Sequence, residues 1–373
     1  MPLPAGAFPR AHHVGSLIRP DSLIKAREAA SRNELAQADL QRIQAAAIRD
    51  VVRLQEDLGL RVVTDGEYNR GSWQRDFLLQ FANVAQVESK LAVKFHNQEG
   101  VREHAPPTLE VQGKLAHPHA IFAGDFAFLK SVARATPKAT FPSPSTLHFR
   151  GGRGAVDQRA YPDLREFYAD LARVYREEIA DLAAVGCRFI QIDEVNLAYL
   201  CDPALRDQAR NFGEDPNELP KTYAKVLNDS VADVPDDMVV SMHLCRGNFA
   251  GAWVAEGGYD PIAELLFNGI DVDVYYLEYD SARAGGFEPL RFLPKGKIAV
   301  LGIMTTKDRR LEDKDELKRR IDEAAQFAPI EQLALSPQCG FSSGIGGNTM
   351  TIDEEVAKLR RLLEVTREVW GTA

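Results

Sequence analysis

Eight short apolar runs recur along the chain, and each is followed by polar or glycine residues and then by a stretch with helical periodicity. Short apolar runs bounded by turn-forming residues are typical of buried β-strands. In chain order the runs span residues 11–16, 61–67, 139–145, 188–194, 237–245, 272–280, 297–304 and 332–340. This pattern predicts an alternation of strands and helices along nearly the whole chain.

The segments between the apolar runs carry helix signals. Residues 163–185 bring apolar side chains to one face at helical spacing, and Gly186 stands where a helix C-terminus is expected. Residues 312–327 show the same spacing. Thr351 and Glu354 have the spacing of a capping box, which predicts that the last helix begins there.

Strands that alternate with helices in this way are parallel and covered by helices. Eight of them close into a (β/α)₈ TIM barrel, so we predict an α/β fold of this class. The alternative, an open doubly wound sheet, is typically marked by a G-x-G-x-x-G turn after an early strand, and the sequence has none. We expect a single domain over residues 1–373, with residues 85–138 inserted as a rim subdomain between strands two and three. Residues 108–115 within that insertion predict a hairpin strand.

Reactive residues stand at the C-terminal ends of these predicted strands, where barrels carry their chemistry. His243 and Cys245 end the fifth run, Glu278 lies near the end of the sixth, and Cys339 ends the eighth. Residues two apart on a strand point to the same side, so the histidine and the first cysteine aim at one region. Imidazole, thiolate and carboxylate groups are all zinc ligands. The four residues therefore predict a metal site, although a cysteine at a strand end is also a common small core residue.

A second polar group lies at the same rim. Glu67 ends the second run, Asp193 and Glu194 end the fourth, and Ser16 follows the first. Several carboxylates facing a barrel mouth are costly unless they meet a cation. The alternative is that they cap the following helices, an interpretation that applies to Glu194 above all.

Composition narrows the classes of function. With 373 residues, 45% hydrophobic and 27% charged, the chain resembles ordinary globular proteins with a large core. Its net charge of −9 argues against nucleic-acid binding, and no apolar stretch is long enough for a membrane span. The first residues lack the pattern of a secretory signal, and four cysteines do not make a disulfide framework, so we expect a cytoplasmic protein. The sequence does not determine the oligomeric state, and a homo-oligomer is one of the states that it allows.

The strand ends carry five longer motifs: AHHVGSLIRP, VVTDGEYNRGSW, QIDEVNLAYLCDP, MHLCRGNF and ALSPQCGFSS. Together these motifs resemble the catalytic barrel of cobalamin-independent methionine synthase. They are most similar to the short single-barrel relatives of that enzyme, which are commonly described as methionine-synthase-like thiol methyltransferases. The resemblance covers essentially the whole chain outside the predicted insertion.

The resemblance implies a zinc-dependent (Zn²⁺) transfer of a methyl group to a small thiol such as homocysteine, giving methionine. The methyl donor would be methyltetrahydrofolate-like or methylcobalamin. The residues that match the zinc ligands of the family are His243, Cys245, Glu278 and Cys339. The carboxylates that hold the amino group of homocysteine match Glu67 and Asp193, which makes Asp193 a catalytic candidate too. The region that contacts the substrate carboxylate matches Ser16.

The chain departs from the family around the methyl donor. The family's histidine after strand seven, taken as its proton donor, has no counterpart in the run LGIMTTKD (301–308). The aromatic residue that stacks on the pterin after strand three is not a tryptophan here, where the run is STLHFRGG (145–152). We therefore hypothesise that His13 or His148 supplies a proton where the leaving group needs one.

Three other functions stay open at this point. An epoxide-opening thiol transferase or lyase would keep the zinc and the thiol and change only the electrophile. A metal-dependent hydrolase would use the metal to activate water, but thiolate ligands make such water less acidic. A non-catalytic binder of a corrinoid or folate carrier would hold a structural zinc with four protein ligands.

Overall fold

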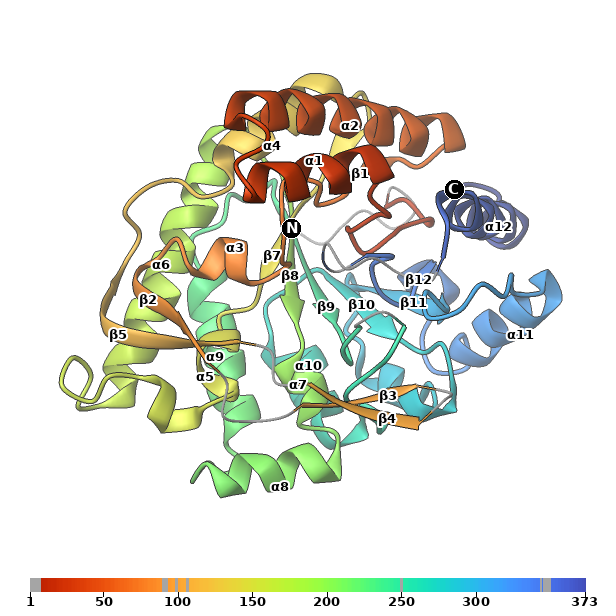
Figure 1. Ribbon diagram of the computed structural model, residues 1–373. Helices are drawn as coiled ribbons and strands as arrows, with labels where there is room; N and C mark the ends of the chain where they lie inside the picture. The colour runs from red at the N-terminus through yellow and green to blue at the C-terminus, as the bar shows by residue number, and fades with distance from the viewer. Residues whose placement is uncertain are drawn as a thin grey trace.

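The computed structural model describes residues 8–88, 93–97, 100–104, 107–248, 251–342, 344 and 350–373. Parallel strands form its centre and helices surround them (Figure 1). Six strands form one parallel sheet in the order β12–β11–β10–β9–β8–β7, beside the parallel pair β1–β6. These strands are β1 (Val62–Val63), β6 (Thr136–Pro137), β7 (Ala139–Pro142), β8 (Phe189–Glu194), β9 (Val239–Leu244), β10 (Val274–Glu278), β11 (Ile298–Met304) and β12 (Leu333–Pro337).

Backbone contacts close these strands into a barrel. Ala11 forms a parallel bridge to Leu335 on β12, and His12 N donates a hydrogen bond to the Leu335 carbonyl at 2.9 Å. On the other side, β1 pairs with β6, which leads directly into β7. Leu17 N donates to the carbonyl of Gly66, which joins the first segment to the turn after β1. The eight apolar runs thus occupy the strand positions of one barrel, so the (β/α)₈ prediction is confirmed and the open-sheet alternative is wrong.

The helices begin and end close to where the sequence predicts. Asp163 caps the helix α6 by accepting a hydrogen bond from Arg165 N at 2.9 Å, and the capping box of Thr351 and Glu354 opens the last helix. None of the described helices is long and apolar enough to cross a membrane. The helices are α1 (Asp21–Ser31), α2 (Gln37–Leu58), α3 (Arg75–Leu78), α4 (Ala123–Val132), α5 (Thr146–Phe149), α6 (Leu164–Ala184), α7 (Asn196–Tyr199), α8 (Pro203–Asn211), α9 (Leu219–Val231), α10 (Ala263–Gly269), α11 (Lys314–Ala324) and α12 (Ile352–Trp370).

Two antiparallel strand pairs lie between β1 and β6. The outer pair joins β2 to β5, where the sequence predicts a hairpin strand, and β3 pairs with β4. His96 on β3 exchanges two backbone hydrogen bonds with Trp253, so this hairpin is attached to the loop after β9. Three parts of the predicted insertion, 89–92, 98–99 and 105–106, lie outside the described residues. The strand bounds are β2 (Ala82–Val87), β3 (Val93–Asn97), β4 (Gly100–His104) and β5 (Thr108–Ala116).

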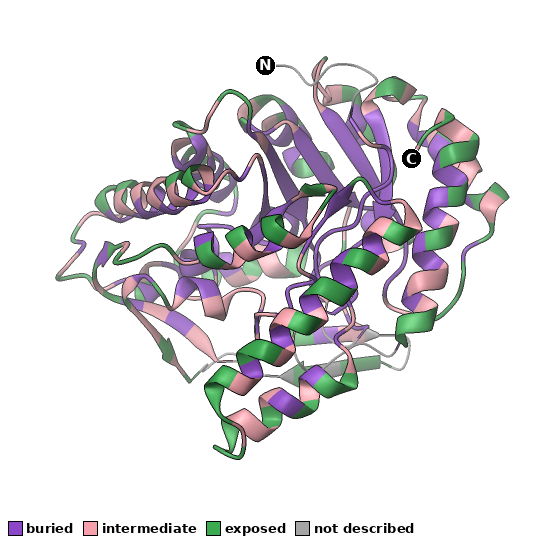
Figure 2. Cartoon of the chain, turned by 90° about the horizontal axis from the view of Figure 1, so that it is seen from above, coloured by how far each residue is buried: buried purple, intermediate pink, exposed green. Residues whose placement is uncertain are grey.

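Alternate residues of each barrel strand pack into two different cores. The outer core lies between the strands and the helices and includes Ile190, Ile192 and Leu277. Figure 2 shows the buried strands at the centre and the exposed residues on the outer faces of the helices. The inner core fills the barrel itself, with Phe8, Val62, Phe189, Val274, Tyr276, Ile298, Val300 and Ala334. Because strand side chains alternate with period two, residues in phase with this inner core point into the barrel.

Candidate metal and thiol site

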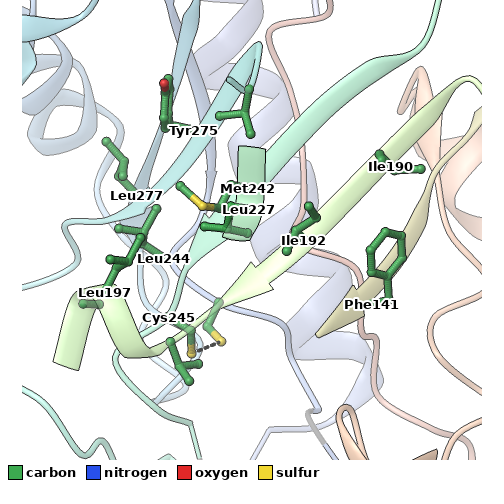
Figure 3. Close-up of a cluster of buried hydrophobic side chains, with 14 of the residues drawn as sticks. Phe141, Ile190, Ile192, Leu197, Leu227, Met242, Leu244, Cys245, Tyr275 and Leu277 are labelled. Carbon is green, nitrogen blue, oxygen red and sulfur yellow. Dashed lines mark hydrogen bonds between the residues drawn. The ribbon is translucent and has the colours of Figure 1, made fainter. Parts of the chain in front are cut away.

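Four potential metal ligands lie together where the barrel strands end. His243, Cys245, Glu278 and Cys339 each offer one ligand atom, and these atoms all lie within 4.8 Å of one another. The two sulfur atoms are 3.6 Å apart, and the dashed line in Figure 3 marks this contact from Cys245. All four side chains are buried. The structure therefore brings together the four residues that the sequence places far apart.

Strand geometry explains why these side chains meet. His243 is in phase with Val239, which packs against the inner core, and Glu278 is in phase with Tyr276, so both point into the barrel. Cys245 N still bonds to the carbonyl of Glu194 at 3.0 Å, so the strand pairing continues past the end of β9. Leu244, which lies between His243 and Cys245, packs in the outer core with Leu277, as Figure 3 shows.

Unpaired polar atoms indicate that the four residues suit a metal ion. Both ring nitrogens of His243 and Oε2 of Glu278 are buried and accept or donate no hydrogen bond within the described chain. Such atoms are costly unless something else bonds to them. Two thiolates on one tetrahedral zinc stand about 3.8 Å apart at the usual Zn–S distance. The 3.6 Å separation of Cys245 and Cys339 is close to that spacing.

In the metal-free protein, the charges at this site favour one thiolate and one thiol. A hydrogen bond from Cys245 holds the pKa of Cys339 well below its usual range against the effect of burial, and His243 acts in the same direction. The same hydrogen bond, together with burial, raises the pKa of Cys245. Burial raises the pKa of Glu278, an effect that the charge of Lys307 opposes. Metal binding would displace the remaining protons, because only deprotonated groups are ligands.

Glu67 lies in a tight turn at the rim and not in a strand. The predicted run 61–67 forms a strand only at Val62–Val63, because the chain turns at Gly66 and Glu67, where φ is +68° and +61°. Asp65 Oδ1 accepts a hydrogen bond from Glu67 N at 2.8 Å and stabilises the turn. The sequence prediction of a strand over the whole run is wrong here, since local side-chain bonding competes with strand pairing.

The Glu67 side chain is held from two sides. Its Oε1 accepts a hydrogen bond from Thr140 Oγ1 at 3.0 Å and lies 3.6 Å from Arg70 Nη1. Arg19 Nη2 donates to its backbone carbonyl at 2.7 Å. A non-glycine residue that is held in a left-handed backbone conformation by such contacts is typical of a functional position.

Asp193 points into the barrel beside Glu67 and His243. Its neighbour two residues earlier, Gln191, donates a hydrogen bond to Asp193 Oδ1 at 2.7 Å. Burial raises the pKa of Asp193 to about 7, His243 opposes this shift, and Glu67 adds to it. Burial lowers the pKa of Lys138 to about 7, although Asp193 and Glu67 favour its charged form. Lys138 thus lies close enough to Asp193 and Glu67 for both carboxylates to act on its charge.

Ser16 lies against the segment that carries Cys339. Its carbonyl accepts a hydrogen bond from Phe341 N at 2.9 Å. A Cβ atom at Gly340 would stand 2.0 Å from Ser16 Oγ, so only glycine allows the hydroxyl its present position. The Gly340 carbonyl in turn accepts a hydrogen bond from Asn248 Nδ2 at 3.0 Å.

Glu194 has a structural role and does not face the mouth of the barrel. Its Oε1 accepts hydrogen bonds from the backbone nitrogens of Asn196 and Leu197 at 2.6 and 2.9 Å, and so caps α7. Its other oxygen accepts from the hydroxyls of Ser143 and Ser145. The capping interpretation of this residue is the one that the hydrogen bonds support.

The two histidines considered as proton donors are directed elsewhere. His13 Nε2 bonds to Gln55 on α2 at 2.9 Å, and burial lowers the pKa of His13 to about 3. His148 Nδ1 bonds to Tyr223 on α9 at 2.9 Å, and its Nε2 lies 3.4 Å from Glu214. These bonds tie both rings to residues other than the four potential ligands. A proton-donor role for either one stays a prediction.

Three residues around this site belong to no motif that predicts a role for them. Arg70 pairs with Glu67, Gln191 bonds to Asp193, and Lys138 bonds to Gln191. Strand periodicity does place Gln191 on the same side as Asp193, so a signal for it existed. No local signal shows that Lys138 points inward, because it stands just before a short strand.

Comparisons with known proteins converge on one family. The sequence profile of the family described as "Cobalamin-independent synthase, Catalytic domain" matches residues 8–368. The uncharacterized protein YxjH of Bacillus subtilis is 40% identical over 363 residues, which cover 97% of this chain and 94% of that protein. The 5-methyltetrahydropteroyltriglutamate–homocysteine methyltransferase of Mycobacterium leprae is 24% identical over 356 residues, and the match spans 95% of this chain but only 42% of that protein.

Solved structures share the architecture. A candidate vitamin-B12-independent methionine synthase from Listeria monocytogenes superimposes with a TM-score of 0.76 at 31% identity, covering 97% of this chain and 98% of that one. A B12-independent methionine synthase from Shewanella, solved with selenomethionine, superimposes with a TM-score of 0.71 at 17% identity over 97% and 98% of the two chains. At this low identity, the similarity to the Shewanella protein concerns the fold alone.

Proposed function

This chain belongs to the family of cobalamin-independent methionine synthase catalytic domains, and from that premise we propose that it is a zinc-dependent methyltransferase acting on a small thiol, homocysteine in the first place. The observation that carries the proposal is the convergence of two thiols, an imidazole and a carboxylate at the mouth of the barrel. The four free, buried cysteines of the chain are compatible with the reducing cytoplasm, which we propose as its location.

The zinc ligands in this proposal are His243, Cys245, Glu278 and Cys339. A zinc ion bound by them supplies positive charge that favours the thiolate form of a substrate thiol near neutral pH. Arg283 Nη2 lies 3.7 Å from Glu278 Oε2 and would compensate this carboxylate whenever it is not bound to metal. Glu278 is therefore the ligand best placed to change partners.

The remaining residues of the site hold the rest of the amino-acid substrate. Glu67 and Asp193 are buried carboxylates, and an ammonium group between them would offset their repulsion. Ser16 Oγ, which lies next to Gly340, would donate a hydrogen bond to the substrate carboxylate. A substrate that is bound at its thiol and at its amino-acid end presents the sulfur to the methyl donor in one orientation. This lowers the entropic part of the activation barrier.

The methyl donor is the open part of this proposal. Transfer to the thiolate breaks the bond between the methyl carbon and its donor, and a departing amine then needs a proton. A donor that leaves as a neutral group needs none. Replacing His13 and His148 together without loss of rate would dismiss both histidines as acids.

The decisive experiment combines metal analysis with a donor screen. The purified protein is expected to contain about one zinc per chain and to methylate homocysteine with methyltetrahydrofolate, as mono- or polyglutamate, or with methylcobalamin. Turnover with an epoxide in place of a methyl donor would favour the thiol transferase alternative. Bound zinc without turnover of any thiol would contradict the proposal and favour a structural metal.

A further inference from the structure

A buried polar layer lies inside the barrel directly below the proposed amine site. Its centre is Lys138, which is 2% exposed. Lys138 Nζ donates to the carbonyls of His13 and Val14 at 2.8 and 3.2 Å, and to Gln191 Oε1 at 2.6 Å. Tyr276 OH lies 3.5 Å away. A barrel interior is normally filled by apolar side chains, so a lysine at this depth needs a reason.

The lysine fixes the orientation of one side-chain amide. An ammonium group only donates hydrogen bonds, so the amide oxygen of Gln191 must face Lys138. The amide nitrogen then faces the other way, where it donates to the Val14 carbonyl at 2.6 Å and to Asp193 Oδ1 at 2.7 Å. A flipped amide would turn its NH₂ group against the ammonium and its oxygen against the carboxylate. The charged form of Lys138 therefore opposes the flipped state, as do the Val14 carbonyl and the Asp193 carboxylate on the other side of the amide.

This amide is the structural link between the lysine and the carboxylate. Within the described chain, the hydrogen bond that the Asp193 carboxylate accepts from Gln191 goes to Oδ1, from below. A donor on one oxygen fixes the plane of the carboxylate and leaves the other oxygen available to a ligand.

We propose that Lys138 is a positioning residue for recognition of the substrate amine: through Gln191 it orients Asp193 so that the carboxylate meets an ammonium group. This inference rests on the proposed function, in which Asp193 binds the amine of the thiol substrate. Lys138 does not touch the reacting sulfur. Its effect is therefore on the preference for thiols that carry an amine and not on the chemistry of transfer.

The test compares two thiols that differ only in the amine. The wild-type protein and the Lys138→Met and Gln191→Met variants are assayed with homocysteine and with 4-mercaptobutanoate, which is homocysteine without its amino group. In both variants KM for homocysteine should rise about 10- to 100-fold, the usual effect of losing a hydrogen bond to a charged group. KM for 4-mercaptobutanoate and kcat for both thiols should change about twofold or less.

A matched control addresses stability. Tyr276→Phe removes a hydroxyl from the same layer but keeps the bond between Lys138 and Gln191, so it should retain the full preference for homocysteine. Zinc content and Tm are measured for every variant. If Lys138→Met does not fold, Gln191→Met still tests the inference, because it removes the amide through which Lys138 acts on Asp193.

The outcomes separate the inference from its premise. If the wild-type protein prefers homocysteine and both variants keep that preference, or lose activity equally toward both thiols, the positioning role is overturned and the proposed function stands. If the wild-type protein itself methylates both thiols equally well, the amine site of the proposed function fails, and the inference fails with it.

Discussion

Gly340→Ala is the substitution for which the structure makes the sharpest prediction. Gly340 follows the proposed ligand Cys339, and an added Cβ would stand 2.0 Å from Ser16 Oγ and 3.2 Å from Ser16 Cβ. Ordinary contact begins at 3.4 Å, so the hydroxyl must move by about 1.4 Å while the Ser16 Cβ adjusts only slightly. The simplest movement is a rotation of the serine side chain to another staggered position.

The rotation should remove one substrate contact and leave the fold intact. If Ser16 binds the substrate carboxylate, losing a hydrogen bond to a charged group costs about 1.5–3 kcal/mol. This corresponds to an increase in KM for homocysteine of about 10- to 100-fold. The free energy of unfolding should fall by about 1 kcal/mol or less, which is the scale of an altered rotamer.

A double-mutant cycle isolates the cause. Steady-state kinetics with homocysteine are measured for Gly340→Ala, Ser16→Ala and the double variant, with zinc content determined for each. Once Ser16 lacks its hydroxyl, the added methyl group meets no oxygen, so the double variant should be no worse than Ser16→Ala alone. Gly154→Ala serves as the control, because a Cβ at that glycine would meet nothing within 4 Å.

Additive effects of the two substitutions would refute this reasoning, because they would show that Gly340 acts independently of Ser16. An unchanged KM in both single variants would remove Ser16 from the proposed substrate site. A loss of zinc in Gly340→Ala alone would mean that the methyl group disturbs Cys339 instead.

Three further predictions follow from the same structure. Cys245→Ser and Cys339→Ser should each release the zinc measured by metal analysis and abolish turnover, while far-ultraviolet circular dichroism stays unchanged; full activity in the double variant would contradict the metal site. Glu355 accepts a hydrogen bond from Ile18 N at 2.8 Å, and burial raises its pKa from 4.5 to about 8. The folded state then binds more protons than the unfolded state between pH 4.5 and 8, so the free energy of unfolding falls as pH rises through this range. In denaturant titrations this fall should be ~5 kcal/mol at most in the wild-type protein, and Glu355→Gln should abolish it. Glu194→Ala should lower Tm through loss of its cap without changing KM for homocysteine in the fraction that stays folded, and a selective change in KM would place Glu194 in the substrate site.

The amino-acid sequence by itself determined the barrel and the direction of most of its side chains. Strand periodicity is a local property, because successive side chains of a strand must point to opposite faces whatever surrounds them. That rule alone aims His243 and Cys245 at one region, and the order of strands and helices sets both at the end of the barrel where Glu278 and Cys339 also lie.

The tertiary structure decided which polar residues of the rim face the mouth. Glu67 and Glu194 both end an apolar run, yet Glu67 leaves the strand in a left-handed turn and Glu194 caps a helix with Ser143 and Ser145 as further partners. Those partners are about 50 residues away in the chain, and no local pattern encodes them. Lys138 shows the same limit, because its inward direction depends on the carbonyls of His13 and Val14, more than 120 residues earlier in the chain. Hydrogen-bond partners of buried polar groups are chosen by the assembled fold, since only there does water leave and each unpaired group become costly.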